Sequence, residues 1–175
     1  KPDLDDTKYK YLRQFGQFFL YKNVKEADIA RFYENTVSEE SLRKLCTGKK
    51  RKKNRERILE NYLVTEDGAD ISDLSELTEI PEAQKKSAVT LDAAEKDSHL
   101  TGSVSAQADG YVMCMIPWEK GWTVTVDGEK VQTQKGDLGF LAFQVDKGEH
   151  QLELTYQVPG LKAGMAAGAV CWFIY

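Results

Sequence analysis

The chain has 175 residues, of which 41 % are apolar and 30 % are charged, and its net charge is −4. This length and composition are typical of one domain with a substantial core and a well-solvated surface. The negative charge argues against a protein that binds nucleic acid with its whole surface, because contacts to phosphates need a cationic face.

Cysteine and histidine usage gives no sign of a metal site or a disulfide framework. The three cysteines, Cys46, Cys114 and Cys171, are far apart, no C-x-x-C motif is present, and there are two histidines. We therefore expect no structural zinc, no disulfides and no cofactor. The chain starts with Lys1, shows no signal-peptide pattern and stops within an apolar run, so we expect a piece of a larger protein.

A strand and a helix are the first predicted elements. Residues 15–21 (FGQFFLY) are rich in aromatic side chains and are typical of a strand. Residues 25–35 (KEADIARFYEN) place Ile29, Phe32 and Tyr33 at helical spacing, which predicts a helix.

Capping signals predict a short second helix. Thr36 followed by Glu39 fits a capping box, in which each side chain bonds a free backbone N–H at the start of a helix. Leu42 and Leu45 would be its buried positions, and Gly48 would end it.

A run of cations follows, which we call the basic run. It consists of Lys49, Lys50, Arg51, Lys52, Lys53, Arg55 and Arg57. The apolar stripe of a further helix comes directly after it, at Ile58, Leu59, Tyr62 and Leu63. A run of like charges is usually a solvated loop and first helical turn. Two alternatives stay open: contact with anionic lipid or an anionic cell-wall polymer, and contact with nucleic acid, which the lack of interleaved aromatic residues disfavours.

The middle of the chain, residues 67–97, is acidic and weakly patterned. Its apolar residues are spaced by three, at Ile71, Leu74, Leu77 and Ile80. This spacing predicts a short helix or a 3₁₀ turn that packs on an apolar surface and ends at Pro81.

From Leu100 onwards the pattern changes to period two and predicts strands. Residues 99–110 (HLTGSVSAQADG) indicate a strand leading into a turn. Residues 111–118 (YVMCMIPW) are almost continuously apolar, which indicates a strand with both faces covered.

Asp127-Gly128 predicts a tight hairpin, because a type I′ turn needs positive φ at both central residues. A two-residue loop also fixes the register of the two strands. The predicted pairs are Val126 with Glu129, Val124 with Val131, and Trp122 with Thr133.

Two more strands complete the predicted sheet. Residues 139–145 (GFLAFQV) form one, and residues 150–158 (HQLELTYQV) alternate between two faces in the other, with a turn at 146–148 between them. Several short strands joined by tight turns predict a mainly β fold. We expect an antiparallel β-sandwich, similar to a jelly roll or a carbohydrate-binding module, with a helical insertion or appendage in the N-terminal half.

Residues 163–175 carry no charge, and Gly160, Gly164 and Gly168 are spaced by four. Small residues at this spacing let membrane helices approach closely. The run is shorter than the roughly twenty residues that span a bilayer. We expect the start of a transmembrane helix or, alternatively, a terminal strand.

Three motifs in order resemble the C-terminal extracytoplasmic region of the YfhO-type bacterial membrane proteins. They are GYVMCMIPWEKGWTVTVDGEKV (110–131), GFLAFQVDKGEHQLELTY (139–156) and PGLKAG (159–164). In that family a strand ending in Ile-Pro-aromatic precedes a Gly-Trp, a Val-Asp-Gly hairpin, a Gly-x-His turn and a Pro-Gly lead-in to the last transmembrane helix. The resemblance is close over residues 98–170 and loose over 15–97.

The resemblance implies a polytopic membrane protein similar to GT-C type glycosyltransferases, which use a polyprenyl-phosphate-linked sugar. The implied role is sugar decoration of a cell-envelope polymer such as teichoic acid. In such proteins the catalytic acidic residue lies in an early loop that this chain does not contain. The chain would be a domain on the extracytoplasmic side of the cell membrane, with its own transmembrane region and a cell-envelope glycopolymer as partners.

The residues themselves predict no catalytic site. No Ser-His-Asp arrangement, Gly-rich phosphate loop or metal-ligand spacing stands out. His99 and His150 are isolated and are interpreted as structural. The hairpin turn is a sufficient explanation of Asp127, because Asp tolerates the left-handed backbone conformation.

Trp118 and Trp122 are the candidate carbohydrate-binding residues. Pro117 and Gly121 predict a sharp corner between two strands. Trp122 shares a strand face with Val124, so we expect it to be a buried core anchor. Trp118 lies closer to the corner, where it either packs on the sheet edge or stacks on a sugar ring.

Our functional hypothesis is a non-catalytic accessory domain of a membrane glycosyltransferase that recognises or positions the acceptor polymer. A free-standing carbohydrate-binding module and a structural or protein-interaction domain without glycan affinity are the alternatives. We divide the chain into residues 1–97, a strand and helical segment packed on the sandwich, 98–160, the core hairpin sheet, and 161–175, the start of a transmembrane helix or a terminal strand.

Overall fold

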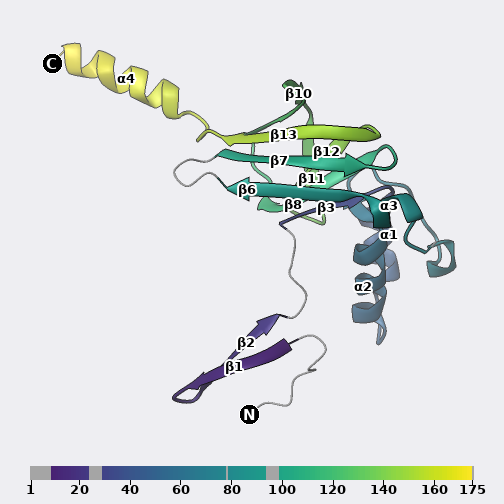
Figure 1. The fold of residues 1–175 in the computed structure, drawn as a ribbon. Coiled ribbons are helices and arrows are strands. Elements are labelled where there is room, and N and C mark those ends of the chain that lie inside the picture. The colour runs from purple at the N-terminus through teal and green to yellow at the C-terminus, as the bar shows by residue number, and fades with distance from the viewer. Residues whose placement is uncertain (1–8, 24–28, 78, 94–98, 175) are drawn as a thin grey trace.

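Two antiparallel sheets form the body of the chain (Figure 1). The structure is a computed structural model that describes residues 9–23, 29–77, 79–93 and 99–174. One sheet has five strands in the order β10-β9-β13-β7-β6, and the other has four in the order β11-β12-β8-β3. The strands are β3 (Ala30–Tyr33), β6 (Ala88–Ala93), β7 (His99–Ala106), β8 (Gly110–Pro117), β9 (Trp122–Val126), β10 (Glu129–Val131), β11 (Thr133–Gly136), β12 (Phe140–Val145) and β13 (Gly148–Tyr156).

The two sheets enclose one apolar core, which confirms the predicted mainly β sandwich. Alternate residues of each strand point inward, as the pleat of a strand requires. The five-stranded sheet contributes Val104, Ala106, Val124, Leu152 and Leu154 to this core, and the four-stranded sheet contributes Ala30, Phe32, Val112, Cys114, Leu141, Phe143 and Val145.

A helical lobe, residues 36–77, supplies a second core. It contains β4 (Thr36–Ser38), α1 (Glu39–Leu45), α2 (Arg51–Asn61), β5 (Leu63–Thr65) and the 3₁₀ turn η1 (Leu74–Glu76), and β4 and β5 pair in parallel. Its buried side chains are Val37, Leu42, Ile58, Tyr62, Val64 and Leu77. The short helix α3 (Glu82–Lys86) follows and leads back to the sandwich at β6.

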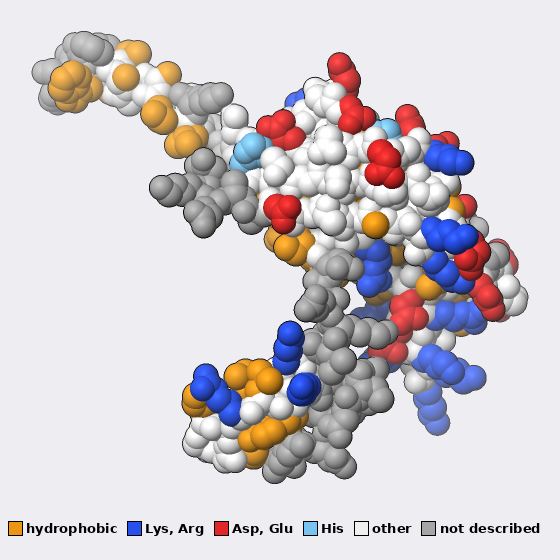
Figure 2. All heavy atoms as spheres, in the orientation of Figure 1, with side chains coloured by type: hydrophobic (Ala, Val, Ile, Leu, Met, Phe, Trp, Pro, Cys, Tyr) orange, Lys and Arg blue, Asp and Glu red, His pale blue; other side chains and the backbone are white. Residues whose placement is uncertain are grey.

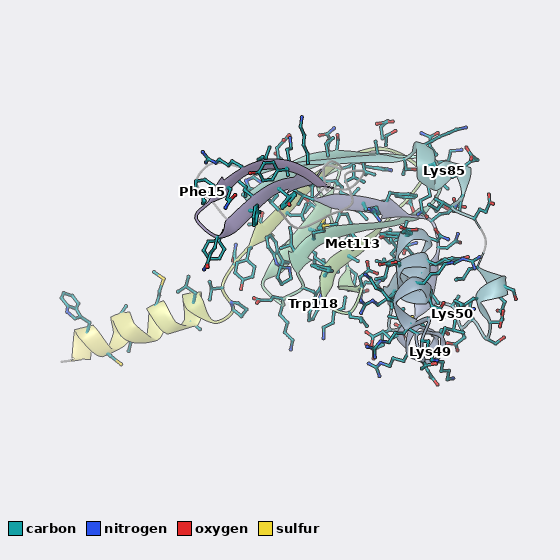
Figure 3. The ribbon with its side chains drawn as sticks, turned by 90° about the horizontal axis from the view of Figure 1, so that it is seen from below. Phe15, Lys49, Lys50, Lys85, Met113 and Trp118 are labelled. Carbon is teal, nitrogen blue, oxygen red and sulfur yellow. The ribbon has the colours of Figure 1, made fainter. Side chains whose placement is uncertain are left out.

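The helical lobe is joined to the outer face of the four-stranded sheet. Leu63 packs there with Tyr33 and Met113, which is labelled in Figure 3. The hydroxyl of Tyr33 donates to the carbonyl of Leu59, and the backbone N–H of Val64 donates to the Asp137 carboxylate at 3.0 Å. Both faces of β8 are therefore covered as far as Cys114, as its apolar sequence predicts, whereas Met115 is 44 % exposed.

The hairpin β1–β2 and the helix α4 extend away from the sandwich (Figure 1). Strands β1 (Tyr9–Phe15) and β2 (Phe18–Asn23) pair with each other. Helix α4 (Leu161–Ile174) has 14 residues, so the apolar run that it contains is a helix and not a strand. In the part of the chain that is described, no helix has the length and apolarity needed to cross a membrane.

The predicted helix over residues 25–35 is wrong. Residues 29–35 are described, and 30–33 form β3, while residues 25–28 lie outside the described residues. Ala30 pairs with Cys114 and Phe32 with Val112 of β8, and both side chains enter the sandwich core. Tertiary pairing thus overrides the helical spacing: Phe32 and Tyr33 are buried on opposite faces of β3, while Ile29 lies before the strand and is 50 % exposed.

Two other boundaries in this half differ from the predictions. The strand predicted over residues 15–21 is divided by the turn of the β1–β2 hairpin, where Gly16 has φ +55°. The N-cap of α1 is Ser38, whose hydroxyl accepts from the N–H of Ser41, whereas Thr36 lies in β4. The helix therefore has its N-cap two residues later than the sequence predicts, although Leu42 is buried as expected.

The predicted hairpin β9–β10 is confirmed in its turn and in two of its three pairs. Asp127 and Gly128 have φ of +52° and +86°, and the pairs Val126–Glu129 and Val124–Val131 form. The third pair, Trp122 with Thr133, is wrong. Strand β10 ends at Val131, Thr133 begins β11 in the other sheet, and Trp122 pairs with Tyr156 of β13.

Candidate functional site

An open groove of about 720 Å³ lies at one end of the sandwich. The β9–β10 hairpin, the link from β10 to β11, and the neighbouring ends of β8 and β12 form its walls. Its lining is mainly polar and consists of Asp67, Tyr111, Val126, Asp127, Glu129, Val131, Gln132, Gln134, Gln144, Val145, Asp146 and His150. We call this set of residues the groove.

Asp127 and His150 fix one wall of the groove. Asp127 accepts from the backbone N–H of Gln151 at 2.8 Å, and His150 Nδ1 lies 2.7 Å from its other oxygen. His150 Nε2 lies 3.1 Å from the carbonyl of Asp146. Both ring nitrogens thus face acceptors, an arrangement that the doubly protonated ring satisfies fully.

These contacts move the pKa values of both groups. The hydrogen bond to Asp127 raises the pKa of His150, and bonds from the backbone of Gln151 and from His150 lower the pKa of the Asp127 carboxyl. The side chain of Asp127 therefore also joins the β9–β10 turn to β13 through hydrogen bonds. These hydrogen bonds hold this wall of the groove in place, and the Asp127–His150 contact is an ion pair when the imidazole is protonated.

Three glutamines give the groove its hydrogen-bonding capacity. Gln132 and Gln134 lie on the link and on β11, and Gln144 lies on β12. Each primary amide offers two donors and a carbonyl acceptor. Adjacent hydroxyls of a sugar also donate and accept, so amides and carboxylates on a concave surface are suited to bind them.

The carboxylates of the groove decide which charge it accepts. Asp67, Asp127, Glu129 and Asp146 all contribute to the lining, with His150 as the one basic group there. This balance disfavours phosphate and favours an uncharged or amine-bearing ligand. Within the described ranges, no cluster of three or more His, Cys, Asp or Glu residues is arranged to hold a metal ion.

Trp118, the first candidate tryptophan, lies beside the groove. It lines a smaller pocket of about 250 Å³ that shares Asp67 and Gln134 with the groove. Its ring is half-buried against the sandwich core, and its indole N–H is buried with no hydrogen-bond partner among the described residues. The ammonium of Lys135 lies 5.1 Å from the ring centroid, so a sugar that stacks there has to displace this side chain.

Trp122, the second candidate, lines neither the groove nor the small pocket. It is half-buried and packs on the sandwich core, and its ring centroid lies 5.1 Å from that of Tyr156. The Tyr156 hydroxyl in turn donates to Glu119 at 2.6 Å. The structure thus places Trp122 as an anchor of the sheet, and it does not bring the two tryptophans into one binding site.

The basic run surrounds the start of α2 (Figure 2). All seven of its cations are exposed, and the first turn of α2 has neither an acidic residue nor a side-chain cap. Arg51, Lys52 and Arg55 line a pocket of about 400 Å³ with Cys46. Cations around uncapped helical N–H groups favour an anion. Figure 3 shows Lys49 and Lys50 on the helical lobe and Trp118 on the sandwich, so these candidates occupy different surfaces.

The groove was not predicted from the sequence. Its walls combine Asp67 of the loop after β5 with Tyr111 and Gln144, which lie far apart along the chain. The alternation of Gln132 and Gln134 with Val131 and Thr133 is the one local signal, since it indicates a strand edge with a polar face. Such a signal predicts that a strand has a polar face, but it does not predict that this face lines a groove.

Comparisons with known proteins identify the family of this chain. A family model described as bacterial membrane protein YfhO matches residues 71–167, which include β6 to β13 and the first turns of α4. An uncharacterized protein YfhO of Bacillus subtilis (strain 168) is 38 % identical over 65 residues, which are 37 % of this chain and 8 % of that protein. No solved structure shows a significant match. The family match covers more than half of the chain, and the chain therefore belongs to the YfhO family of bacterial membrane proteins.

Proposed function

We propose that this chain is the extracytoplasmic, non-catalytic part of a membrane glycosyltransferase and that its groove binds the acceptor glycan. The observation that carries the proposal is a groove of about 720 Å³ lined by three glutamines and four carboxylates, on a sandwich that belongs to a family of bacterial membrane proteins. The role of the domain is to hold the acceptor polymer while chemistry takes place elsewhere in the protein.

The groove and the basic run differ in charge, so each suits a different part of an acceptor polymer. The groove favours an uncharged or amine-bearing sugar, because four carboxylates face it. The basic run favours the phosphates that link the units of a polymer such as teichoic acid. Sugar substituents would then be recognised at the groove and the anionic chain at α2.

An NMR titration with glycan fragments tests the groove. The side-chain amide signals of Gln132, Gln134 and Gln144 should shift when sugar-substituted glycerol-phosphate fragments are added, together with the backbone amides of the β9–β10 turn. In the double variant Gln134→Ala/Gln144→Ala affinity should fall by about thirtyfold, since each of the two hydrogen bonds lost contributes on the order of 1 kcal/mol.

Gln107→Ala is the matched control, because Gln107 is exposed and lies outside the groove. Its affinity should equal that of the native chain. Equal affinity of all three proteins, or shifts confined to residues outside the groove, would contradict the proposed site.

A separate titration tests the basic run with unsubstituted glycerol-phosphate polymer. Reversing the charges of Arg51, Lys52 and Lys53 to Glu should abolish binding, and the binding of the native chain should weaken steeply as salt is added. Binding that survives the charge reversal would remove the basic run from the proposal without affecting the groove.

A further inference from the structure

The hairpin β1–β2 exposes large apolar side chains that no other described part of the chain covers. The exposed fractions are 50 % for Leu12, 51 % for Phe15, 70 % for Phe18 and 43 % for Leu20. Phe15 and Phe18 are cross-strand partners on either side of the Gly16-Gln17 turn, so the tip of the hairpin is aromatic. An isolated two-stranded hairpin is marginally stable in water, and an exposed patch of this kind indicates a partner.

The composition of the hairpin identifies the chemistry of that partner. Residues 9–23 contain three cations, Lys10, Arg13 and Lys22, and no acidic residue, in a chain whose net charge is −4. The guanidinium of Arg13 lies 4.2 Å from the ring centroid of Phe15, which places a cation next to the aromatic tip. Figure 2 shows this mixture of apolar and basic side chains on the hairpin.

Aromatic rings combined with Lys and Arg are the composition of protein segments at a lipid–water interface. Rings enter the headgroup region, and cations remain at the level of the lipid phosphates. A protein groove would instead select a narrower set of side chains at fixed spacing. We propose that the hairpin β1–β2 is a membrane-docking element whose tip, Phe15 and Phe18, inserts into the lipid–water interface of a bilayer.

The basic run lacks the feature that makes the hairpin suitable for lipid. No large apolar side chain is exposed among the residues of α2, because Ile58 is buried and Leu59 is half-buried. Glu56 and Glu60 also lie on that helix, and Lys52 approaches Glu56 at 3.9 Å. Charge without an exposed apolar surface holds a segment near a membrane only weakly.

Apolar insertion is expected to contribute more than charge. In the sequence, residues 1–8 and 24–28 add five acidic residues and three lysines, so the formal net charge of residues 1–28 is only +1. The chain should therefore bind vesicles of phosphatidylcholine alone. Its binding should strengthen several-fold when about a third of the lipid is phosphatidylglycerol.

Vesicle co-sedimentation of the full chain tests the proposal. The variant Phe15→Ser/Phe18→Ser should lower the partition coefficient by about tenfold or more, because two large apolar side chains no longer enter the interface. The matched control is Met115→Ser/Leu138→Ser, which removes two apolar side chains of 44 % and 53 % exposure from the sandwich. The control should bind within about twofold of the native chain.

Helix α4 is also apolar, and it contributes equally to the vesicle binding of the native chain and both variants. Differences in binding between these three proteins therefore come from the substituted side chains. Far-ultraviolet circular dichroism and the unfolding midpoint should be alike in all three, which shows that the sandwich is intact. Equal partitioning of the tip variant and the control would overturn the proposal. So would vesicle-independent dimers that the tip variant dissociates, since the occupant would then be a second copy of the chain.

Discussion

The hairpins β1–β2 and β9–β10 both have a two-residue turn, but their surroundings are opposite. Each is antiparallel and turns at a glycine with positive φ, +55° at Gly16 and +86° at Gly128. In β9–β10, Val124 is fully buried in the sandwich. In β1–β2, Phe18 is 70 % exposed. The sequence of a hairpin therefore specifies its turn, whereas its neighbours decide whether its apolar face stabilises the fold or remains available to a partner.

Truncation of one leucine in each region should give the largest difference. Leu154 is fully buried opposite Val124, so Leu154→Ala should lower the free energy of unfolding by about 3 kcal/mol through lost contacts and a cavity. Leu20 is 43 % exposed, so Leu20→Ala should cost less than about 0.5 kcal/mol. Urea unfolding followed by tryptophan fluorescence measures both. Similar losses would show that the hairpin is part of the cooperative core.

The glycines of the two turns provide a second, smaller contrast. An added Cβ meets open space at both Gly16 and Gly128, so an alanine there brings only the strain of positive φ. Gly128→Ala should destabilise the sandwich by about 1 kcal/mol. Gly16→Ala should leave the unfolding midpoint unchanged, because β1–β2 opens independently of the sandwich. A shift of the midpoint for Gly16→Ala would contradict that independence.

The side-chain bonds of the β9–β10 turn should add a weaker dependence on pH. The pKa of His150 is raised, so its contribution is present below the unfolded value of about 6.5 and is lost as pH rises through the folded value. The pKa of Asp127 is lowered, so its contribution is present above about 3.9 and is lost as pH falls through the folded value. The pair therefore stabilises the fold mainly between these two limits.

Asp127→Asn keeps a residue that tolerates the turn and removes the charge. The stability difference between the native chain and this variant should be larger at pH 5.5 than at pH 8, which lies about 1.5 units above the unfolded value for His. His150→Gln should give the same profile, because it removes the other half of the pair. Differences that do not change with pH would show that the Asp127–His150 contact does not stabilise the fold as an ion pair.

Most of the sandwich can be predicted from the sequence, because its signals are local. Local patterns indicate β7 to β10, β12 and β13, whereas no pattern predicts β6 or β11. Asp127-Gly128 indicates a turn that the structure confirms. The prediction at β3 is wrong because the apolar spacing there is also typical of a helix. Pairing with β8 makes this segment a strand. The predicted pair Trp122–Thr133 does not form because the chain crosses to the other sheet after Val131.

The groove is harder to predict because it is not local. It needs the loop at Asp67, the turn at Asp127 and the strand at Gln144 to converge, and that convergence depends on the docking of the helical lobe on the four-stranded sheet. The exposure of the tip of β1–β2 also cannot be predicted from the sequence pattern. An aromatic-rich strand predicts burial, and only the structure shows that Phe15 and Phe18 are uncovered.

Backbone hydrogen exchange of the full chain, with and without vesicles that contain phosphatidylglycerol, tests the contrast between the two hairpins most directly. The account predicts that vesicles slow exchange across residues 9–23, most strongly around the turn at Gly16, and leave β9–β10 unchanged. Exchange in the hairpin β1–β2 that is unaffected by vesicles, with protection appearing at the basic run instead, would contradict it.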